Sequence, residues 1–259
     1  MKIIVCVKHV PDAAADRGFA ADGTTDRESV DCLLSELDEC AVEQALRIVE
    51  SGTEAEITYL TVGPEKAADA LRKALAMGGD RAVHVSDDAV AGTDALGTSL
   101  ILAEAIRSLG FDLVVTGMAS TDAGMGVVPA MLAERLGVPG ITYLDELTVD
   151  GRTVTGRRES GTASEQVTAL MPAVVSVTDR SGEARYPSFK GIMAAKKKPY
   201  RSLDLADLGV EPGQVGLGAA WSAVDTTAKR PPRAKGEIVR DEGDGGAGLA
   251  AFLAAGRFV

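Results

Sequence analysis

The sequence predicts an α/β fold: a single main domain with a largely parallel, Rossmann-like nucleotide-binding sheet covered by helices. Two observations favour it. Short apolar runs rich in β-branched residues alternate with amphipathic segments of helical period over residues 2–136, and glycine-containing loops follow several of the runs. Strands that alternate with helices pair in parallel through right-handed crossovers. We expect this domain to span residues 1–210, followed by an extended C-terminal arm at 211–259.

The expected strands of the first half are continuous apolar runs, as strands buried on both faces require. They lie at residues 2–7, 56–62, 81–85 and 113–116. Helices are expected between them, where apolar residues recur every three or four positions. They lie at residues 38–50, after Gly63-Pro64, from a cap at Thr93 or Asp94 to Gly110, and at residues 127–136. The polar segment 11–35 has no clear period and indicates an excursion or a hairpin.

The pattern changes after residue 140. Residues 146–158 predict a hairpin around Asp150-Gly151, because Asp-Gly is a favoured two-residue turn. Residues 211–245 are rich in glycine, proline and charge, which is typical of a linker or an extended arm. The remaining expected elements are strands at 165–170 and 173–177, a loop followed by a short helix at 187–198, and one or two helical turns at 247–252.

Composition excludes several classes of function. The formal net charge of −11 and the aromatic content of 4% argue against nucleic-acid binding. The cysteines, Cys6, Cys32 and Cys40, are odd in number and lack metal-ligand spacing, which indicates reduced thiols of a cytoplasmic protein. No apolar run approaches the length of a membrane span. We therefore expect a cytoplasmic protein with no metal site, no nucleic-acid partner and no membrane insertion.

The most informative motif is the apolar run that ends at Gly117 and continues into a loop with Gly124 and Gly126. A helix follows, with Pro129 in its first turn. Glycines let the backbone approach an anion, and the N–H groups of a helix N-terminus bind phosphate. The loop matches neither the P-loop nor the dinucleotide-binding glycine pattern, and it contains no lysine for a triphosphate. It fits a mono- or diphosphate held by backbone donors, or a tight strand-to-helix turn that binds nothing.

Several other residues have two interpretations. Asp122 contacts a ribose hydroxyl or caps N–H groups of its own loop, and His9 faces a ligand or lies in an exposed turn. His84, inside a strand, is interpreted as structural, and the lysines at 196–198 as a solvated helix end rather than a site for an acidic partner. Phe189 docks a partner if it is exposed on its loop, or else packs into the core. The sequence contains no catalytic constellation, so we expect no enzyme activity of its own.

Five segments, in order along the chain, resemble the beta subunit of electron-transfer flavoprotein, and the resemblance extends over nearly the whole chain. They are residues 1–12 (MKIIVCVKHVPD), 38–46 (DECAVEQAL), 63–82, 158–159 with 170–177, and 185–198 (RYPSFKGIMAAKKK). The resemblance implies a heterodimer with an alpha subunit that carries a redox-active FAD, while this chain holds AMP in a structural role. In electron-bifurcating relatives a second FAD takes the place of AMP. The resemblance further implies that electrons arrive from dehydrogenases, such as acyl-CoA dehydrogenases, and leave to a quinone-linked acceptor.

The resemblance also assigns site residues. The nucleotide is expected against Cys6, Ser35, Leu37, Asp38, Val62, Gly117, Met118, Ala119, Ser120, Thr121, Asp122, Ala123, Gly124, Met125, Gly126, Val127 and Val128. The dehydrogenase is expected to dock on Tyr186, Pro187, Ser188, Phe189, Lys190, Gly191, Ile192 and Met193, with Phe189 as the apolar anchor. Arg158 and Glu159 are expected on the flavin side of the subunit interface, and the 211–259 arm is expected to wrap the alpha subunit.

Some positions depart from the family pattern. Ser35-Glu36 stands where Asn-Pro is common, Met125 and Val127 stand where Thr and Gln are common, and Ala13 replaces a Tyr that lies near the flavin in some members. The loss of polar side chains leaves the phosphate to backbone donors and to Ser120 or Thr121, which favours AMP over a second FAD. The alternative is a stand-alone adenine-nucleotide-binding protein of the universal-stress type, which shares the sheet and the loop but does not require the segments at 158–177 and 186–198.

Overall fold

The computed structural model describes residues 1–236 and 238–259, which form two compact units. The first unit spans Met1–Asp225 and the second spans Thr226–Val259. The first unit continues past the expected domain end at residue 210. There Val215 is buried against the core, and the Gly216 N–H donates to the Thr93 hydroxyl at 2.7 Å. The chain therefore still contacts the α/β domain at residues 215–216, and residues up to 225 belong to the first unit.

A seven-stranded sheet in which every neighbouring pair is parallel forms the centre of the first unit, in the order β12-β5-β4-β1-β6-β11-β7. The strands are β1 (Lys2–Cys6), β4 (Glu56–Val62), β5 (Arg81–Val85), β6 (Leu113–Gly117), β7 (Gly140–Leu144), β11 (Ala173–Val177) and β12 (Tyr200–Leu203). The predicted parallel α/β fold is confirmed. All five inner strands were expected from the sequence, whereas the two edge strands, β7 and β12, were not.

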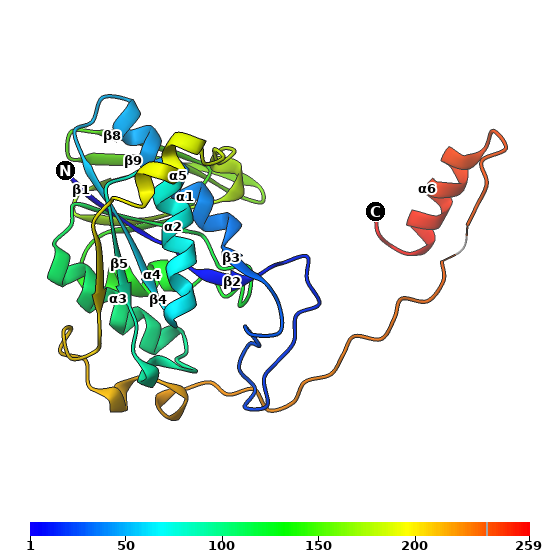
Figure 1. Ribbon diagram of the computed structural model, residues 1–259. Helices are drawn as coiled ribbons and strands as arrows, with labels where there is room; N and C mark the ends of the chain where they lie inside the picture. The colour runs from blue at the N-terminus through cyan, green and yellow to red at the C-terminus, as the bar shows by residue number, and fades with distance from the viewer. Residues whose placement is uncertain (237) are drawn as a thin grey trace. The chain divides into compact units, whose positions relative to one another are not determined.

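Helices cover both faces of the sheet (Figure 1). They are α1 (Glu36–Glu50) and α2 (Ala68–Met77) over one face, and α3 (Ala95–Leu109) and α4 (Val128–Leu136) over the other. Because side chains alternate along a strand, Ile3 and Val5 of β1 pack beneath α1 and α2, while Ile4 packs beneath α3 and α4. Short 3₁₀ turns complete the unit at η1 (Glu65–Ala67), η2 (Asp88–Val90), η3 (Asp179–Ser181), η4 (Pro212–Gln214) and η5 (Leu217–Ala219).

Two antiparallel excursions leave the main sheet. β2 (His9–Pro11) and β3 (Cys32–Leu34) pair at the base of the 12–31 loop, so the expected excursion contains a short hairpin. β8 (Glu146–Asp150), β9 (Thr153–Ser160) and β10 (Ala163–Leu170) form a three-stranded sheet, which confirms the predicted hairpin. Gly151 has φ +55° in its turn, a conformation that glycine adopts without strain.

The last two helices are short or apolar. α5 (Phe189–Ala195) lies beside α2 (Figure 1). The second unit contains α6 (Gly245–Ala255), which is longer than the expected one or two turns and leaves Leu249, Phe252 and the following Phe258 exposed. Within the described residues, no helix combines the length and the apolar character needed to cross a membrane.

Candidate functional site

The carboxyl ends of β1, β4 and β6 meet at one edge of the sheet. The chain places β4 and β5 on one side of β1 and then β6 on the other, so the strand order reverses beside β1. Ligands of open α/β sheets bind in the crevice outside such a reversal. At this edge lie Lys8, which follows β1, and the Gly117 loop, which follows β6. The two are far apart in the sequence.

The loop between β6 and α4 has the backbone of an anion site. Gly124 and Gly126 adopt φ of +64° and +65°, the left-handed region that favours glycine. α4 begins after Val127 without a side-chain cap on its first amides. The first N–H groups of a helix have no partner within the helix, so these amides are available to an anion.

Asp38 joins three elements at this edge. Its Oδ2 accepts the Lys8 N–H at 2.8 Å, and its Oδ1 accepts the Gly117 N–H at 3.2 Å. Burial raises the pKa of this carboxyl to about 7, although both backbone donors and the Lys8 ammonium lower it. The contact is so close that a Cβ on Gly117 would lie 2.6 Å from Asp38 Oδ1 and 2.8 Å from the Leu37 carbonyl oxygen. Gly117 therefore lets the start of α1 approach the end of β6.

Ser35 contributes a polar group without a partner. It precedes α1 and is fully buried, but its hydroxyl caps no helix amide and has no hydrogen-bond partner among the residues that the structure describes. A buried hydroxyl left in this state costs free energy unless a ligand or water completes it. Ser35 thus leaves an unsatisfied hydroxyl at the start of α1, on the same helix as Asp38.

Three basic side chains reach the glycine loop from other parts of the chain. Lys8 Nζ donates to Asp122 Oδ1 at 2.9 Å and to Ser120 Oγ at 3.2 Å, and Arg27 donates to Asp122 Oδ2. Arg17 of the 12–31 loop donates to the Thr121 carbonyl. The loop itself contains no lysine, and the positive charge comes from Lys8, which follows β1, and from Arg17 and Arg27. No pattern in the polar 12–31 loop indicates that its two arginines reach residues 121 and 122.

Asp122 binds two of these cations, Lys8 and Arg27. Its side chain is only 1% exposed, and it also accepts the Ala123 N–H at 2.8 Å, so it caps its own loop. Burial by itself raises the pKa of Asp122, but the Lys8 ammonium and the hydrogen bonds from Ser120, Lys8 and Arg27 hold it well below its usual range. Asp122 is therefore an ionised internal counter-charge for Lys8 and Arg27.

The remaining residues expected around the nucleotide lie at the same edge. Cys6 is buried at the end of β1, and burial together with the Asp38 carboxylate raises the pKa of its thiol. Val62 ends β4 and is half-buried. Met125 is 58% exposed in the glycine loop. These side chains are apolar or neutral. The polar groups at this edge are therefore the backbone, the Ser35 and Ser120 hydroxyls, the carboxylates of Asp38 and Asp122, and the three basic side chains.

The two histidines differ. His9 begins β2 and is half-buried, and burial lowers its pKa. His84 is buried in β5, where its Nδ1 accepts from the Tyr200 hydroxyl at 2.8 Å and its Nε2 donates to the Gly63 carbonyl at 2.9 Å. Both ring nitrogens of His84 are used, as expected for a structural histidine. In the described part of the chain no group of three His, Cys, Asp or Glu residues is placed to hold a metal ion.

The expected docking segment presents apolar side chains on a short helix. Phe189 is 81% exposed and Tyr186 is 90% exposed, and Ile192 and Met193 are exposed beside them. We call these four residues the α5 apolar surface. Phe189 is the first residue of α5 rather than part of a loop, and Ser188 Oγ caps the helix by accepting the Gly191 N–H at 3.0 Å. The interpretation that Phe189 packs into the core is wrong for this chain.

The backbone of this segment is fixed to α1 and α2 at both ends. Arg185 Nε donates to Glu43 Oε2 at 2.7 Å, and its other nitrogens bind Glu43 and Glu50. At the other end Lys198 Nζ donates to the Leu75 and Gly78 carbonyls at 2.8 and 2.9 Å. Lys198 thus satisfies the last carbonyls of α2, and the expectation of a solvated lysine end is wrong for this residue.

Arg158 and Glu159 lie on β9 in a surface network of ion pairs. Arg158 Nε contacts Glu165 Oε2 at 2.7 Å, and Glu159 accepts from Arg157 at 2.7 Å and from Arg180 at 3.1 Å. Exposed pairs of this kind contribute little to stability. Their place on the three-stranded sheet leaves them accessible in this chain.

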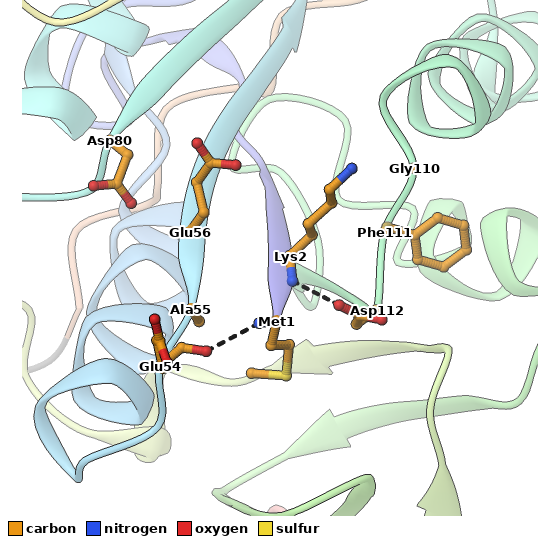
Figure 2. Close-up of a pocket in the computed structure, with 9 residues that line it drawn as sticks. All are labelled: Met1, Lys2, Glu54, Ala55, Glu56, Asp80, Gly110, Phe111 and Asp112. Atoms are coloured by element: carbon orange, nitrogen blue, oxygen red, sulfur yellow. Dashed lines mark hydrogen bonds between the residues drawn. The ribbon is translucent and has the colours of Figure 1, made fainter.

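The opposite, amino end of the sheet carries a polar hollow (Figure 2). Its lining residues are Met1, Lys2, Glu54, Ala55, Glu56, Asp80, Gly110, Phe111 and Asp112. The Met1 amine donates to the Glu54 carbonyl at 2.9 Å and the Lys2 N–H donates to Asp112 Oδ2 at 2.7 Å, as Figure 2 shows. These contacts tie the first strand to its neighbours. The carboxylates around the hollow disfavour a phosphate there, which leaves the carboxyl edge as the candidate nucleotide site.

Comparison with known proteins identifies the class. Residues 22–208 match the family model described as electron transfer flavoprotein domain. The chain is 45% identical to the electron transfer flavoprotein subunit beta of Mycobacterium leprae over 263 aligned residues, which cover 99% of each chain. It is 33% identical to the subunit beta of Megasphaera elsdenii, covering 94% of this chain and 93% of that one. A caffeyl-CoA reductase-Etf complex subunit, CarD, of Acetobacterium woodii is 32% identical over 92% of each chain.

The chain therefore belongs to the electron transfer flavoprotein family, among its beta subunits. Membership confirms the resemblance seen in the sequence and replaces the universal-stress alternative. It implies flavin-dependent electron transport by a heterodimer with an alpha subunit.

Proposed function

We propose that this chain holds one AMP at the carboxyl edge of its sheet and docks flavin dehydrogenases, such as acyl-CoA dehydrogenases, through the α5 apolar surface. In the heterodimer, FAD on the alpha subunit supplies the redox chemistry that passes electrons to a quinone-linked acceptor. The observation that carries the proposal is the uncapped start of α4 behind Gly124 and Gly126, with Lys8, Arg17 and Arg27 around the same loop.

The residues at this edge fit an adenine monophosphate. The α4 amides, and the hydroxyl of Ser120 beside Lys8, are donors of the kind that a phosphate requires. The unpartnered Ser35 hydroxyl offers a further polar contact in the same region. A single uncapped helix start behind Gly124 and Gly126 provides backbone donors for one phosphate group. This arrangement supports AMP over FAD, which has a diphosphate.

The alternative ligand of this site is a second FAD, and the similarity of the chain to CarD supports it. CarD, a subunit of a caffeyl-CoA reductase-Etf complex, is similar to this chain over 92% of its length. Electron bifurcation would require a flavin in the beta subunit. Counting the nucleotides in the purified heterodimer separates the two alternatives.

We also propose that the second unit contributes to the contact with the alpha subunit. Leu249 and Phe252 of α6 are exposed in this unit. Phe258 and Val259, which follow the helix in the same unit, are exposed as well. Exposed apolar side chains in such numbers are typical of a segment that a partner covers. The arm expected at 211–259 would then act mainly through residues 226–259.

One co-expression experiment tests these proposals. The chain is produced with its alpha subunit, both in full and ending at residue 225, and the purified protein is denatured for chromatography of its nucleotides. We expect about one AMP and one FAD per heterodimer, and we expect the shortened chain to lose its alpha subunit. Two FAD and no AMP would establish the bifurcating alternative, and copurification of the shortened chain would contradict the role of the second unit.

A further inference from the structure

Tyr143 has a backbone conformation that an aromatic residue rarely adopts. Its φ is +62°, and among the described non-glycine residues only Arg257 is also positive. For a bulky side chain the left-handed region is strained, and such strain is retained where the surrounding structure fixes it and a function uses it. Tyr143 lies on β7, the strand that precedes the three-stranded sheet.

The surroundings of Tyr143 fix this conformation. Its N–H donates to the buried Ser176 hydroxyl at 2.9 Å, and the carbonyl of the next residue, Leu144, accepts the Thr178 N–H at 2.9 Å. The register between β7 and β11 shifts at the same place, between Val175 and Val177. Tyr143 thus leaves the regular ladder, and contacts to β11 and the residue after it hold it there.

The strained backbone brings the Tyr143 side chain to the glycine loop. The hydroxyl donates to the Gly126 carbonyl at 3.2 Å, and a Cβ on Gly126 would lie 2.2 Å from the hydroxyl oxygen. The φ of +65° at residue 126 favours glycine, and a Cβ there would displace the Tyr143 hydroxyl. The carbonyl and the following N–H of a trans peptide point in opposite directions. Holding the Gly126 carbonyl toward Tyr143 turns the Val127 N–H away from it.

We propose that Tyr143 is a positioning residue of the nucleotide site, whose hydroxyl fixes the Gly126–Val127 peptide so that the Val127 N–H and the uncapped start of α4 face a bound phosphate. This inference rests on the AMP site proposed above. Tyr143 itself does not need to touch the nucleotide, because it acts through the Gly126 carbonyl. A single hydrogen bond thus links β7 to the orientation of the amides in the loop.

The test is the exchange of bound AMP for isotopically labelled AMP in the purified heterodimer, followed by mass spectrometry. Tyr143→Phe keeps the ring and removes the hydroxyl, and we expect it to exchange AMP about two- to tenfold faster, as the loss of one net hydrogen bond predicts. Tyr200→Phe is the matched control, since it removes a tyrosine hydrogen bond of 2.8 Å to His84 on the distant β12 edge. We expect this control to exchange at the wild-type rate.

A second variant covers the case in which Tyr143→Phe does not fold. Tyr143→Gly relieves the backbone strain as well as removing the hydroxyl, so it is expected to fold and still to exchange AMP faster. Wild-type exchange in either folded Tyr143 variant would overturn the positioning role, and equal acceleration in Tyr200→Phe would make the effect nonspecific and overturn it as well. A wild-type heterodimer that neither contains AMP nor takes up labelled AMP would overturn the proposed AMP site, and this inference with it.

Discussion

The glycine loop and the α5 apolar surface differ in which groups are held by contacts and which stay available to a partner. In the loop, side chains are the anchors: Asp122 is buried in contacts with Lys8 and Arg27, while the backbone amides at the start of α4 stay available. At α5 the anchors fix the backbone through Arg185 and Lys198, while the side chains are left exposed. The difference matches the proposed ligands, since a phosphate is bound by N–H groups and a protein partner by apolar side chains.

The comparison predicts that the loop tolerates changes in its packing poorly. Gly117→Ala places a Cβ within 2.8 Å of both the Asp38 carboxylate and the Leu37 carbonyl, and backbone cannot move aside as a flexible side chain can. We expect the free energy of unfolding to fall by about 1–3 kcal/mol, the usual cost of overpacking, and bound nucleotide to be lost. Urea unfolding of the heterodimer and nucleotide extraction measure the two effects.

The matched control for this prediction is Gly213→Ala. Gly213 has no atom within 4 Å of the position of an added Cβ. We expect it to change the free energy of unfolding by less than about 0.5 kcal/mol and to leave nucleotide content unchanged. If Gly117→Ala behaved like this control, the close approach of α1 to β6 would have no role in the site.

The pH dependence of stability tests the buried charge beneath the loop. Burial raises the pKa of Asp38 to about 7 in the folded chain, above the ordinary value of 3.8, so the folded state binds this proton more tightly than the unfolded state does. The stabilising contribution of the protonated carboxyl is therefore complete below about pH 4 and is lost as pH rises through about 7. The slope approaches roughly 1.4 kcal/mol per pH unit between these values.

The variant Asp38→Asn isolates this contribution, because the amide does not titrate. We expect the difference in unfolding free energy between wild type and Asp38→Asn to shift in favour of the variant from pH 5 to pH 7 and to be constant above about pH 8. Urea titrations at each pH measure it. A difference that does not change with pH would mean that Asp38 is ionised throughout, and that its two backbone donors outweigh burial.

The contrast between inner and edge strands explains how much of the fold the sequence could predict. The five inner strands are covered by helices on both faces, which requires a continuous apolar run such as Leu113–Gly117. The edge strand Tyr200–Leu203 buries only Leu203, and Gly140–Leu144 contains the exposed Tyr143. Strands paired on one side only carry too few apolar residues for periodicity to detect.

The same limit applies to the site. The glycine loop could be predicted because its strand, glycines and helix start are contiguous in the sequence. Lys8, Arg17 and Arg27 reach it only through folding, and the last two come from a polar segment without any period. Likewise, the sequence around Arg185 does not indicate that its guanidinium pairs with Glu43 of α1, a helix far earlier in the chain. Long-range ion pairs depend on the fold and leave no pattern in the sequence.

The smallest expected effect on stability comes from the α5 segment. Variants here separate the role of the exposed Phe189 side chain from that of Arg185, which holds the segment to α1. Phe189 is 81% exposed, so Phe189→Ala should change the free energy of unfolding by less than about 0.5 kcal/mol. Arg185→Ala should cost about 1 kcal/mol, since Glu43 is buried but Arg47 still contacts it and the Arg185 side chain is partly screened by solvent. Both variants should raise the KM for an acyl-CoA dehydrogenase reduced by its acyl-CoA substrate.

The double variant decides whether Arg185 acts through Phe189. If Arg185 serves to hold the α5 apolar surface in its docking geometry, its removal costs nothing further once the aromatic anchor is gone, because residues that act as a unit are not additive. We therefore expect the KM of Phe189→Ala/Arg185→Ala to equal that of Phe189→Ala within about twofold, while the two stability effects still add. A KM that rises by the product of the two single effects would show that Arg185 contacts the dehydrogenase independently, and an unchanged KM in Phe189→Ala would remove the docking role from α5 altogether.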